Sequence, residues 1–530
     1  MNTEYGIAID IGTSGIRAQS YDLNSQKTIS TAITLRHPLP GANVVDHLHF
    51  ALEFGVEKAN NLLINAIVKV IKNLNDENIT KIAVCGNPIQ LSLFNNIEIR
   101  DLAYWGENAL KNQNITPPDR KAKTVKASTL GFDFEADIYI PPAIKHEIGA
   151  DALAMLYKSN ALNNDEDSLI IDFGTNAEMA LIVDGEVFTA SAAAGPAIEG
   201  QSIEKGRLAS PNTICDIEKE NEYWRVKILD DELYPCDGDL INPETGAVIE
   251  KNEFKANGIT GTGVIAAFSL AIDDGIIEND KIFLQDDIYL TKEDILNIGK
   301  ALGAFRAGQI TLAESADIYL DDIDSVYMAG ASGFYVDVKK SLKVGQIPPS
   351  SSEIYQLGNT SLSMAKDIVL NPDLLDDLQE IADSIESNHV MLATSDIFEK
   401  IYSLELAMYE QNMPFSTYRQ WLLKYGFQDI PPLEENPNIH KLINRDIEYS
   451  GENPIKTVDI SNYKKSCFDN CIYCMECVDN CPENALSLNA EEFNLRTDLC
   501  SGLGCLRCQS SCKQNAFKYN QFYRSDKDEL

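Results

Sequence analysis

The chain has 530 residues, of which 44% are hydrophobic and 24% charged, a composition typical of a globular protein with more than one domain. Acidic residues outnumber basic ones by 81 to 44, and the net charge of −37 excludes the basic face that nucleic-acid binding requires. No run of about 20 apolar residues is present, and the N-terminus lacks the pattern of a secretory signal. We therefore expect a cytoplasmic protein that neither binds nucleic acid nor enters a membrane.

A short pattern near the N-terminus occurs again in the middle of the chain. Ile9–Ser14 and Ile171–Asn176 align without a gap, and each contains Asp-x-Gly-Thr between two apolar runs. The flanking runs are Tyr5–Ile9, Ile16–Tyr21, Ser168–Ile171 and Met179–Val183. A strand, a tight glycine turn and a second strand predict a β-hairpin. Such a turn can bind phosphate through its backbone N–H groups, with a hydroxyl and a Mg²⁺-binding carboxylate nearby.

Each copy supplies candidate ligands for a nucleotide. Asp10 and Asp172 are candidates for binding the metal ion or its water. The candidate phosphate-binding residues are Gly12, Thr13, Ser14, Gly174, Thr175 and Asn176. Glu178 and Glu199 are candidates for activating water or binding Mg²⁺, although either could equally cap a turn.

The duplicated hairpin resembles the two phosphate loops of the ATPase superfamily that includes actin, sugar kinases and heat-shock chaperones. This resemblance implies two ribonuclease-H-like lobes that bind ATP, with a glycine turn after a strand lying against the adenosine. Gly330 and Gly333 follow the apolar run Val326–Ala329 and fit that element. Two other phosphate motifs fail, because no P-loop is present and the glycines at 261–263 follow polar residues rather than a buried strand.

The later part of the chain contains helical patterns and then a cysteine-rich segment. Apolar spacing near 3.6 residues predicts helices over Glu293–Ala307 and Pro372–Ile385. We expect four regions: an ATPase lobe at 1–160, a second lobe at 161–368, a helical connector and linker at 369–454, and an iron–sulfur domain at 455–530.

Nine of the 12 cysteines lie between Cys467 and Cys512, in two related runs. In a C-x2-C-x2-C-x3-C-P run, three cysteines bind one [4Fe–4S] cluster while the fourth reaches the other cluster. The spacing predicts one ligand set of Cys471, Cys474, Cys477 and Cys512, and another of Cys481, Cys500, Cys505 and Cys508. A pair of zinc sites is the alternative. The loop after Cys500 is longer than its counterpart, and Cys467 is expected to be a bystander.

Further segments resemble one family, the reductive activators of corrinoid proteins, and most closely those that serve methylamine methyl transfer. They are Tyr5–Ser14, His37–Asn43, Asp46-His47, Cys85–Asn87, Gly149–Asp151, Ala193–Gly200, Ala329–Gly333 and the double cysteine run. The segment Ala193–Gly200 adds Gly195 to the candidate nucleotide-binding residues. The resemblance implies an α/β, two-lobed actin/sugar-kinase-like ATPase with a C-terminal α+β ferredoxin-like domain.

The resemblance also implies a reaction: ATP-dependent reduction of Co(II) to Co(I) in a corrinoid methyl-carrier protein, through two [4Fe–4S] clusters. ATP and Mg²⁺ are the further expected cofactors. The expected partners are a carrier of the methylamine type, its methyltransferases and an external low-potential electron donor. The alternatives are an electron donor to another low-potential enzyme, a small-molecule kinase fused to a ferredoxin, and a redox-sensing binding module.

His47 is interpreted as a local polar feature, and Arg306 as a residue that could face the nucleotide.

Overall fold

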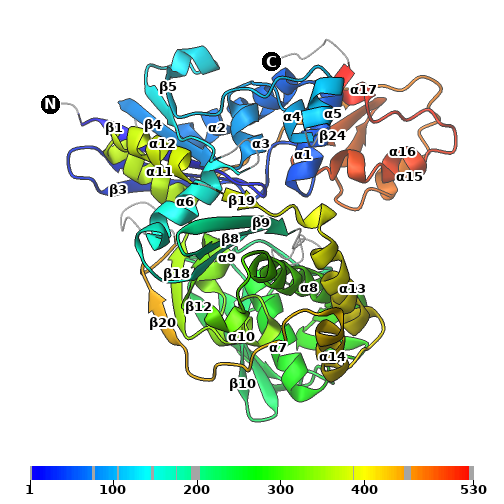
Figure 1. The fold of residues 1–530 in the computed structure, drawn as a ribbon. Helices are drawn as coiled ribbons and strands as arrows, with labels where there is room; N and C mark the ends of the chain where they lie inside the picture. Colours follow the sequence, from blue (N-terminus) through cyan, green and yellow to red (C-terminus); the bar gives the residue numbers. More distant parts are fainter. Residues whose placement is uncertain are drawn as a thin grey trace. The chain divides into compact units, whose positions relative to one another are not determined.

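A computed structural model describes residues 3–74, 78–103, 107–144, 148–174, 176–192, 203–385, 387–446 and 455–524. The chain divides into two compact units, coloured along the sequence in Figure 1. Unit 1 comprises Met1–Leu153, Ser361–Ser384 and Ile447–Leu530, and unit 2 comprises Ala154–Thr360 and Ile385–Asp446. The predicted division at residues 160, 368 and 454 treats the domains as continuous, whereas both units are assembled from separated segments.

Unit 1 contains a seven-stranded sheet of order β21-β3-β2-β1-β4-β6-β5. Its strands are β1 (Tyr5–Ile11), β2 (Ile16–Asp22), β3 (Thr28–Ile33), β4 (Ile79–Gly86), β5 (Lys123–Lys126), β6 (Asp137–Ile140) and β21 (Lys456–Thr457). β1, β2 and β3 form an antiparallel meander, and β4 runs parallel to β1. Ile7, Ala8 and Ile9 are fully buried, as expected of a strand covered on both faces.

The helices of unit 1 come from separate segments of the chain. They are α1 (Val44–Phe54), α2 (Val56–Leu74), α3 (Pro88–Phe94), α4 (Arg100–Ala103), α5 (Glu107–Asn112), α11 (Thr360–Leu370) and α12 (Leu374–Ser384), while α6 (Ala150–Ser159) carries the chain into unit 2. In α2, Leu63, Ile67, Val70 and Leu74 are buried at intervals of three and four, which is the pattern of a helix packed on a core. The predicted helix at residues 372–385 is confirmed as α12.

The C-terminal module of unit 1 is a small α+β structure. Its elements are β22 (Tyr463–Ser466), β23 (Leu486–Asn489), β24 (Glu492–Arg496), α15 (Glu476–Asp479), α16 (Arg507–Ser510) and α17 (Gln521–Arg524). The sheet has the order β22-β24-β23. Its core consists of Phe468, Phe493, Phe517 and Phe522, whose ring centroids lie 4.5–5.9 Å apart. Large aromatic rings let so small a module bury enough apolar surface.

Unit 2 contains a second seven-stranded sheet, of order β19-β9-β8-β7-β17-β18-β20. Its strands are β7 (Ser168–Phe173), β8 (Ala177–Val183), β9 (Glu186–Ala192), β17 (Ser325–Ala329), β18 (Glu353–Gly358), β19 (Ser387–His389) and β20 (Asn438–Lys441). β7, β8 and β9 repeat the antiparallel meander of β1–β3, and β17 runs parallel to β7 as β4 does to β1. Each copy of the sequence pattern therefore begins a sheet of the same order, and both predicted hairpins are confirmed.

The rest of unit 2 consists of smaller sheets and helices. The further strands are β10 (Thr213–Glu220), β11 (Tyr223–Leu229), β12 (Pro235–Ile241), β13 (Val248–Glu250), β14 (Gly258–Ile259), β15 (Lys281–Gln285) and β16 (Ile288–Thr291). The helices are α7 (Gly261–Asp274), α8 (Lys292–Ser315), α9 (Gly330–Tyr335), α10 (Val338–Val344), α13 (Asp396–Glu410) and α14 (Phe415–Tyr425). α8 confirms the helix predicted at residues 293–307 and continues to Ser315, and Thr291 and Asp294 form a capping box at its start.

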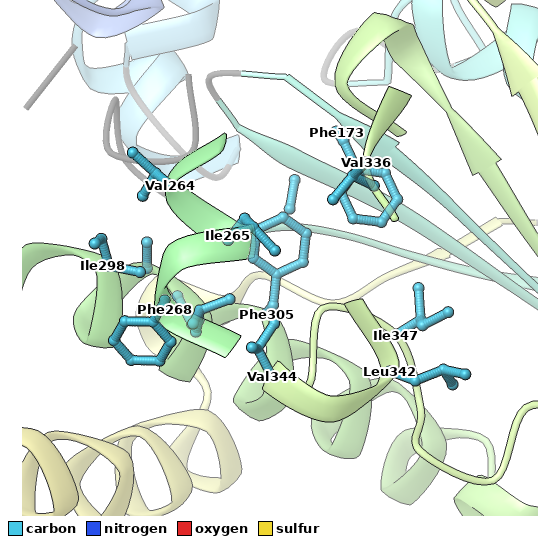
Figure 2. Close-up of a cluster of buried hydrophobic side chains, with 14 of the residues drawn as sticks. Phe173, Val264, Ile265, Phe268, Ile298, Phe305, Val336, Leu342, Val344 and Ile347 are labelled. Carbon is cyan, nitrogen blue, oxygen red and sulfur yellow. The ribbon is translucent and has the colours of Figure 1, made fainter. Parts of the chain in front are cut away.

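The core of unit 2 packs against the strand that leads into the second hairpin. Figure 2 shows side chains from α7, α8 and the segment after α9 gathered below β7. Phe173 of β7 stacks on Phe305 of α8 with ring centroids 5.4 Å apart and an interplanar angle of 23°. Since Phe173 follows Asp172 directly, this packing fixes the end of the strand from which the hairpin turns. No helix within the described ranges is long and apolar enough to cross a membrane.

Candidate functional site

The first hairpin has a tight turn between β1 and β2. The Gly12 N–H donates to the Gly15 carbonyl at 3.0 Å, which places Thr13 and Ser14 in the turn itself. The Thr13 hydroxyl accepts a hydrogen bond of 3.3 Å from Asn87 Nδ2, at the start of α3. The hairpin thus offers backbone N–H groups and hydroxyls close together, which is the arrangement that binds phosphate.

Two carboxyl groups lie close together at the end of β1. Asp10 is paired in register with the buried Cys85 of β4. Burial raises the pKa of Asp151 to about 6, and the charge of Asp10 contributes to the rise. Burial raises the pKa of Cys85 as well, with contributions from both carboxylates. A divalent cation would relieve this repulsion, and carboxylate oxygens are the ligands that Mg²⁺ prefers.

Asp151 was not among the sequence-predicted site residues. It lies at the start of α6, and only the fold brings it to Asp10, which is more than a hundred residues away in the chain. The one signal in the sequence was its place in the Gly149–Asp151 segment that resembles the family.

The second hairpin turns between β7 and β8, where the Gly174 N–H donates to the Asn176 carbonyl at 3.2 Å. Glu178 of β8 lies opposite Asp172 in the ladder, and Glu178 Oε1 accepts a 2.8 Å hydrogen bond from the Ser191 hydroxyl. These candidates therefore share one end of the sheet. The structure does not describe Thr175, Gly195 and Glu199, so their predicted roles lie outside the described residues.

The glycine turn after β17 lies against the second hairpin. Gly330 has φ of +79°, and a Cβ atom there would lie 2.4 Å from Asp172 Oδ1. Only glycine fits so close to the carboxylate in this backbone conformation. Gly333 lies one turn on, where a Cβ would lie 2.8 Å from the Phe173 ring. The structure thus brings the predicted adenosine turn and the second phosphate hairpin together within unit 2.

Arg306 has a different place from the one suggested by the sequence. It is 8% exposed within unit 2, where its guanidinium donates to Glu405 Oε2 and to the Val344 carbonyl, both at 3.0 Å. Glu405 is fully buried on α13. These contacts give Arg306 the role of joining α8 to α13 rather than that of a nucleotide ligand.

The cysteines of the C-terminal module form two groups. Electrostatic interactions join Cys471, Cys477 and Cys512 in one group and Cys481, Cys500, Cys505 and Cys508 in the other. Cys474 lies near Lys513, the residue that follows Cys512. Cys512 thus joins the first run and Cys481 joins the second, as in the crossed arrangement that the spacing predicts.

The environment of the cysteine sulfurs suits iron–sulfur ligation. Backbone N–H groups donate to four sulfurs: Tyr473 to Cys471 and Gly502 to Cys500 at 3.4 Å, Ala485 to Cys481 at 3.3 Å, and Phe517 to Cys512 at 3.4 Å. Such bonds stabilise thiolates and tune cluster potentials. Within the described ranges, no three His, Cys, Asp or Glu side chains are arranged to bind a single metal ion. The N–H donors and the crossed grouping of the cysteines fit the predicted cluster ligation.

The module packs on the N-terminal lobe within unit 1. The Tyr523 ring lies 4.9 Å from that of Phe50 and 4.6 Å from that of Phe54, both on α1. Glu53 of the same helix pairs with Arg524 at 3.0 Å. On the module side, Tyr519 Oη lies 3.7 Å from Cys500 Sγ. One cysteine group therefore lies close to the surface by which the module contacts the lobe.

Models of known families match most of the chain. The middle region of RACo matches residues 5–163, the C-terminal ASKHA domain of RACo matches residues 166–419, and a 4Fe-4S binding domain matches residues 468–487. The [Co(II) methylated amine-specific corrinoid protein] reductase of Methanosarcina barkeri is 45% identical over 496 residues, covering 91% of this chain and 92% of that protein. The corrinoid activation enzyme RamQ of Eubacterium limosum is 23% identical, covering 76% and 70%.

A solved structure agrees with these matches. A reductive activator for corrinoid, iron–sulfur protein superposes with a TM-score of 0.64 at 25% identity, over 76% of this chain and 66% of that one. The predicted fold, an actin/sugar-kinase-like ATPase with a C-terminal iron–sulfur domain, is thereby confirmed. The extent and identity of the Methanosarcina barkeri match show the family. The chain belongs to the reductive activators of corrinoid proteins.

Proposed function

We propose that this protein uses ATP to drive the reduction of Co(II) to Co(I) in a corrinoid methyl-carrier protein of the methylamine type. The observation that carries the proposal is the combination, in one chain, of duplicated phosphate-type hairpins with two crossed groups of cysteines. The name of the Methanosarcina barkeri relative supports the choice of partner. The methyltransferases served by that carrier and an external low-potential donor complete the proposed set of partners.

Two [4Fe–4S] clusters are proposed, one in each cysteine group. The ligand sets are Cys471, Cys474, Cys477 and Cys512 for one, and Cys481, Cys500, Cys505 and Cys508 for the other. When bound, such clusters accept and donate single electrons at low potential. The protein orients the thiolates, donates N–H groups to their sulfurs and buries Cys477. One electron enters from the external donor for each electron that leaves to cobalt.

ATP and Mg²⁺ are proposed to bind at the duplicated hairpins. Asp10 and Asp151 would bind the cation or its water in unit 1, and Asp172 and Glu178 would serve in unit 2. The proposed phosphate and adenosine contacts are Gly12, Thr13, Ser14, Gly174, Thr175, Asn176, Gly195, Gly330 and Gly333, with Glu199 as a further carboxylate. An uphill electron transfer of about 200 mV requires roughly 4.6 kcal/mol for one electron, which a conformational change linked to ATP can supply.

The experiment compares wild type with Asp10→Asn in an anaerobic assay that follows cobalt absorbance with carrier, reductant and ATP. We expect ATP-dependent formation of Co(I) to fall on the order of a hundredfold, because a carboxylate that binds the cation is lost. The iron and sulfide contents should not change. Asp22→Asn is the control, since Asp22 lies at the far end of β2 and accepts from the N–H groups of Asn24 and Ser25, which asparagine can also do. Wild-type ATP dependence in Asp10→Asn would contradict the proposal.

A further inference from the structure

A continuous set of contacts within unit 1 joins the first hairpin to the Cys500 loop. We propose that Asn87, Gln90 and His47 are positioning residues through which nucleotide at Thr13 changes the reduction potential of the cluster bound by Cys500. This inference rests on the proposed function, since it requires that nucleotide and cluster bind where that function places them. It adds the residues that connect the two sites, and it states which of the two clusters responds to nucleotide.

At the nucleotide end, Asn87 makes contacts in two directions. Its Nδ2 donates to Thr13 Oγ1 at 3.3 Å, while its Oδ1 accepts from the Gln90 N–H at 3.0 Å and caps α3. A phosphate oxygen that accepts from the Thr13 hydroxyl would reorient that hydroxyl and so change its hydrogen bond with Asn87. Because one side chain makes both bonds, such a change alters the start of α3 as well.

In the middle of the route lies a buried cluster of polar side chains. Gln90 and His47 are both fully buried, and Gln90 Nε2 lies 2.8 Å from His47 Nδ1. The His47 ring stacks on that of His37 with centroids 4.1 Å apart. Burial lowers the pKa of His47 to about 3 and lowers that of His37 as well, so both rings are neutral at pH 7. Neutral stacked rings transmit displacement by contact rather than by charge.

This cluster is also incompletely satisfied. Among the described residues, Gln90 Oε1, His37 Nε2 and His47 Nε2 are buried and have no partner in good hydrogen-bond geometry, although the Gln90 side chain lies beside His37. Buried polar groups without partners are rare and disfavour the arrangement that contains them. A small displacement that gives any of them a partner would therefore be favourable. Such a cluster is suited to having two arrangements of similar free energy.

At the cluster end, the segment after His37 contacts the Cys500 loop. His37 Nδ1 accepts from the Leu39 N–H at 3.2 Å, and the Gly41 N–H donates to the Cys500 carbonyl at 2.9 Å. The buried Thr497 hydroxyl donates to the Pro38 carbonyl at 3.1 Å. A displacement of His37 is therefore passed to the main chain of a cluster ligand.

The longer loop after Cys500 makes this contact possible. A Cβ atom at Gly502 would lie 3.3 Å from the Pro40 carbonyl, and one at Gly504 would lie 3.2 Å from Asp46 Oδ1. The corresponding loop of the first run is open instead, since Ile472 is 62% exposed. Hydrogen bonds and solvent exposure tune the potential of an iron–sulfur cluster. We therefore expect nucleotide to act on the Cys500 cluster and to leave the Cys471 cluster unchanged.

The test is a redox titration of the full, reconstituted protein, followed by EPR, without nucleotide, with ADP and with a non-hydrolysable ATP analogue. In wild type we expect nucleotide to change the reduced-to-oxidised ratio of one cluster about tenfold at a fixed potential, which is about 59 mV for one electron. The responding signal should be the one that Cys500→Ala lacks. Gln90→Met, which keeps the side-chain volume but not the amide, should bind nucleotide with wild-type affinity and lose the shift.

Two further variants separate the route from a general weakening of α3. Asn60→Ala removes the bonds to the Leu93 and Phe94 carbonyls, at 2.8 and 2.9 Å, which anchor the other end of the helix, and it should keep the shift. Asn87→Ser keeps an N-cap but shortens the side chain that reaches Thr13, so it should lose the shift even if Gln90→Met fails to fold.

The outcomes distinguish the two proposals. Failure of wild type to bind nucleotide would overturn the proposed function and the coupling with it. Nucleotide binding without any change of potential would overturn only the coupling. A wild-type shift in Asn87→Ser or Gln90→Met, or loss of the shift in Asn60→Ala, would exclude this route.

Discussion

The two cysteine runs share a left-handed backbone conformation at two pairs of corresponding residues. Met475 and Leu506, which precede α15 and α16, have φ of +66° and +46°. Asn484 and Asn515 have φ of +51° and +52°. Left-handed residues are uncommon outside glycine, so their recurrence at matched places indicates a true structural duplication. In each run the fourth cysteine lies with the other group.

The crossed ligand sets predict which substitutions are equivalent. Cys481→Ala and Cys500→Ala should lose the same cluster, although Cys481 belongs to the first run, and each should retain about half of the iron. Cys512→Ala should lose the other cluster, and Cys467→Ser should retain all of the iron. Iron analysis and EPR of the remaining cluster provide the measurement. If the spectrum of Cys481→Ala matched that of Cys471→Ala instead, each run would bind its own cluster.

Residues whose role follows from their spacing in the chain could be predicted from the sequence. Residues whose role depends on a partner that is distant in sequence could not. The cysteine spacing reflects the size of the cluster itself. Asp151 acquires its raised pKa only where the fold brings it to Asp10. His47 was interpreted as a local polar feature, yet it is fully buried against His37. Neither partner can be identified from sequence neighbours.

At the scale of elements, the junction of α8 and α13 contains a buried ion pair. Arg306 and Glu405 are 10% and 0% exposed in their side chains. Burial raises the pKa of Glu405, and the nearby guanidinium opposes the rise. The same two helices carry a second pair, Lys300 with Glu410 at 3.1 Å, whose side chains are 39% and 41% exposed. The two pairs join the same helices but differ in burial.

Glu405→Gln should destabilise unit 2 by about 3–5 kcal/mol, because it leaves a buried guanidinium without its countercharge. Lys300→Ala should change stability by about 1 kcal/mol or less, since the exposed pair is screened by water. The measurement is the denaturant midpoint, followed by tryptophan fluorescence, to which the buried Trp224 of unit 2 contributes. Equal shifts for the two variants would show that burial of the pair does not matter.

The existence of helices could be predicted better than their ends and their packing. The apolar period predicts α8 and α12 and places the start of α8 within one residue of its capping box, whereas α8 continues to Ser315, beyond the predicted end at Ala307. The region expected to be a helical connector contributes to both units, since α12 belongs to unit 1 while α13 and α14 belong to unit 2. Which unit a helix joins depends on long-range contacts that its own sequence does not contain.

At the scale of the molecule, duplication explains most of what could be predicted. Two copies of one hairpin pattern begin two sheets with the same strand order. The discontinuity of both units could not be predicted, because the contacts that bring separated segments into one unit are long-range and leave no local pattern in the sequence. The central claim is that the cysteine clusters deliver electrons to cobalt when ATP is present.

A single-turnover experiment tests that claim most directly. The protein is reduced, freed of reductant and mixed anaerobically with the Co(II) carrier, with or without ATP, while cobalt absorbance and the cluster EPR signal are recorded on the same sample. With ATP, we predict that Co(I) appears as the signal of the reduced clusters disappears, electron for electron. Without ATP, neither should change. Equal formation of Co(I) without ATP, or Co(I) formed while the clusters stay reduced, would contradict the account.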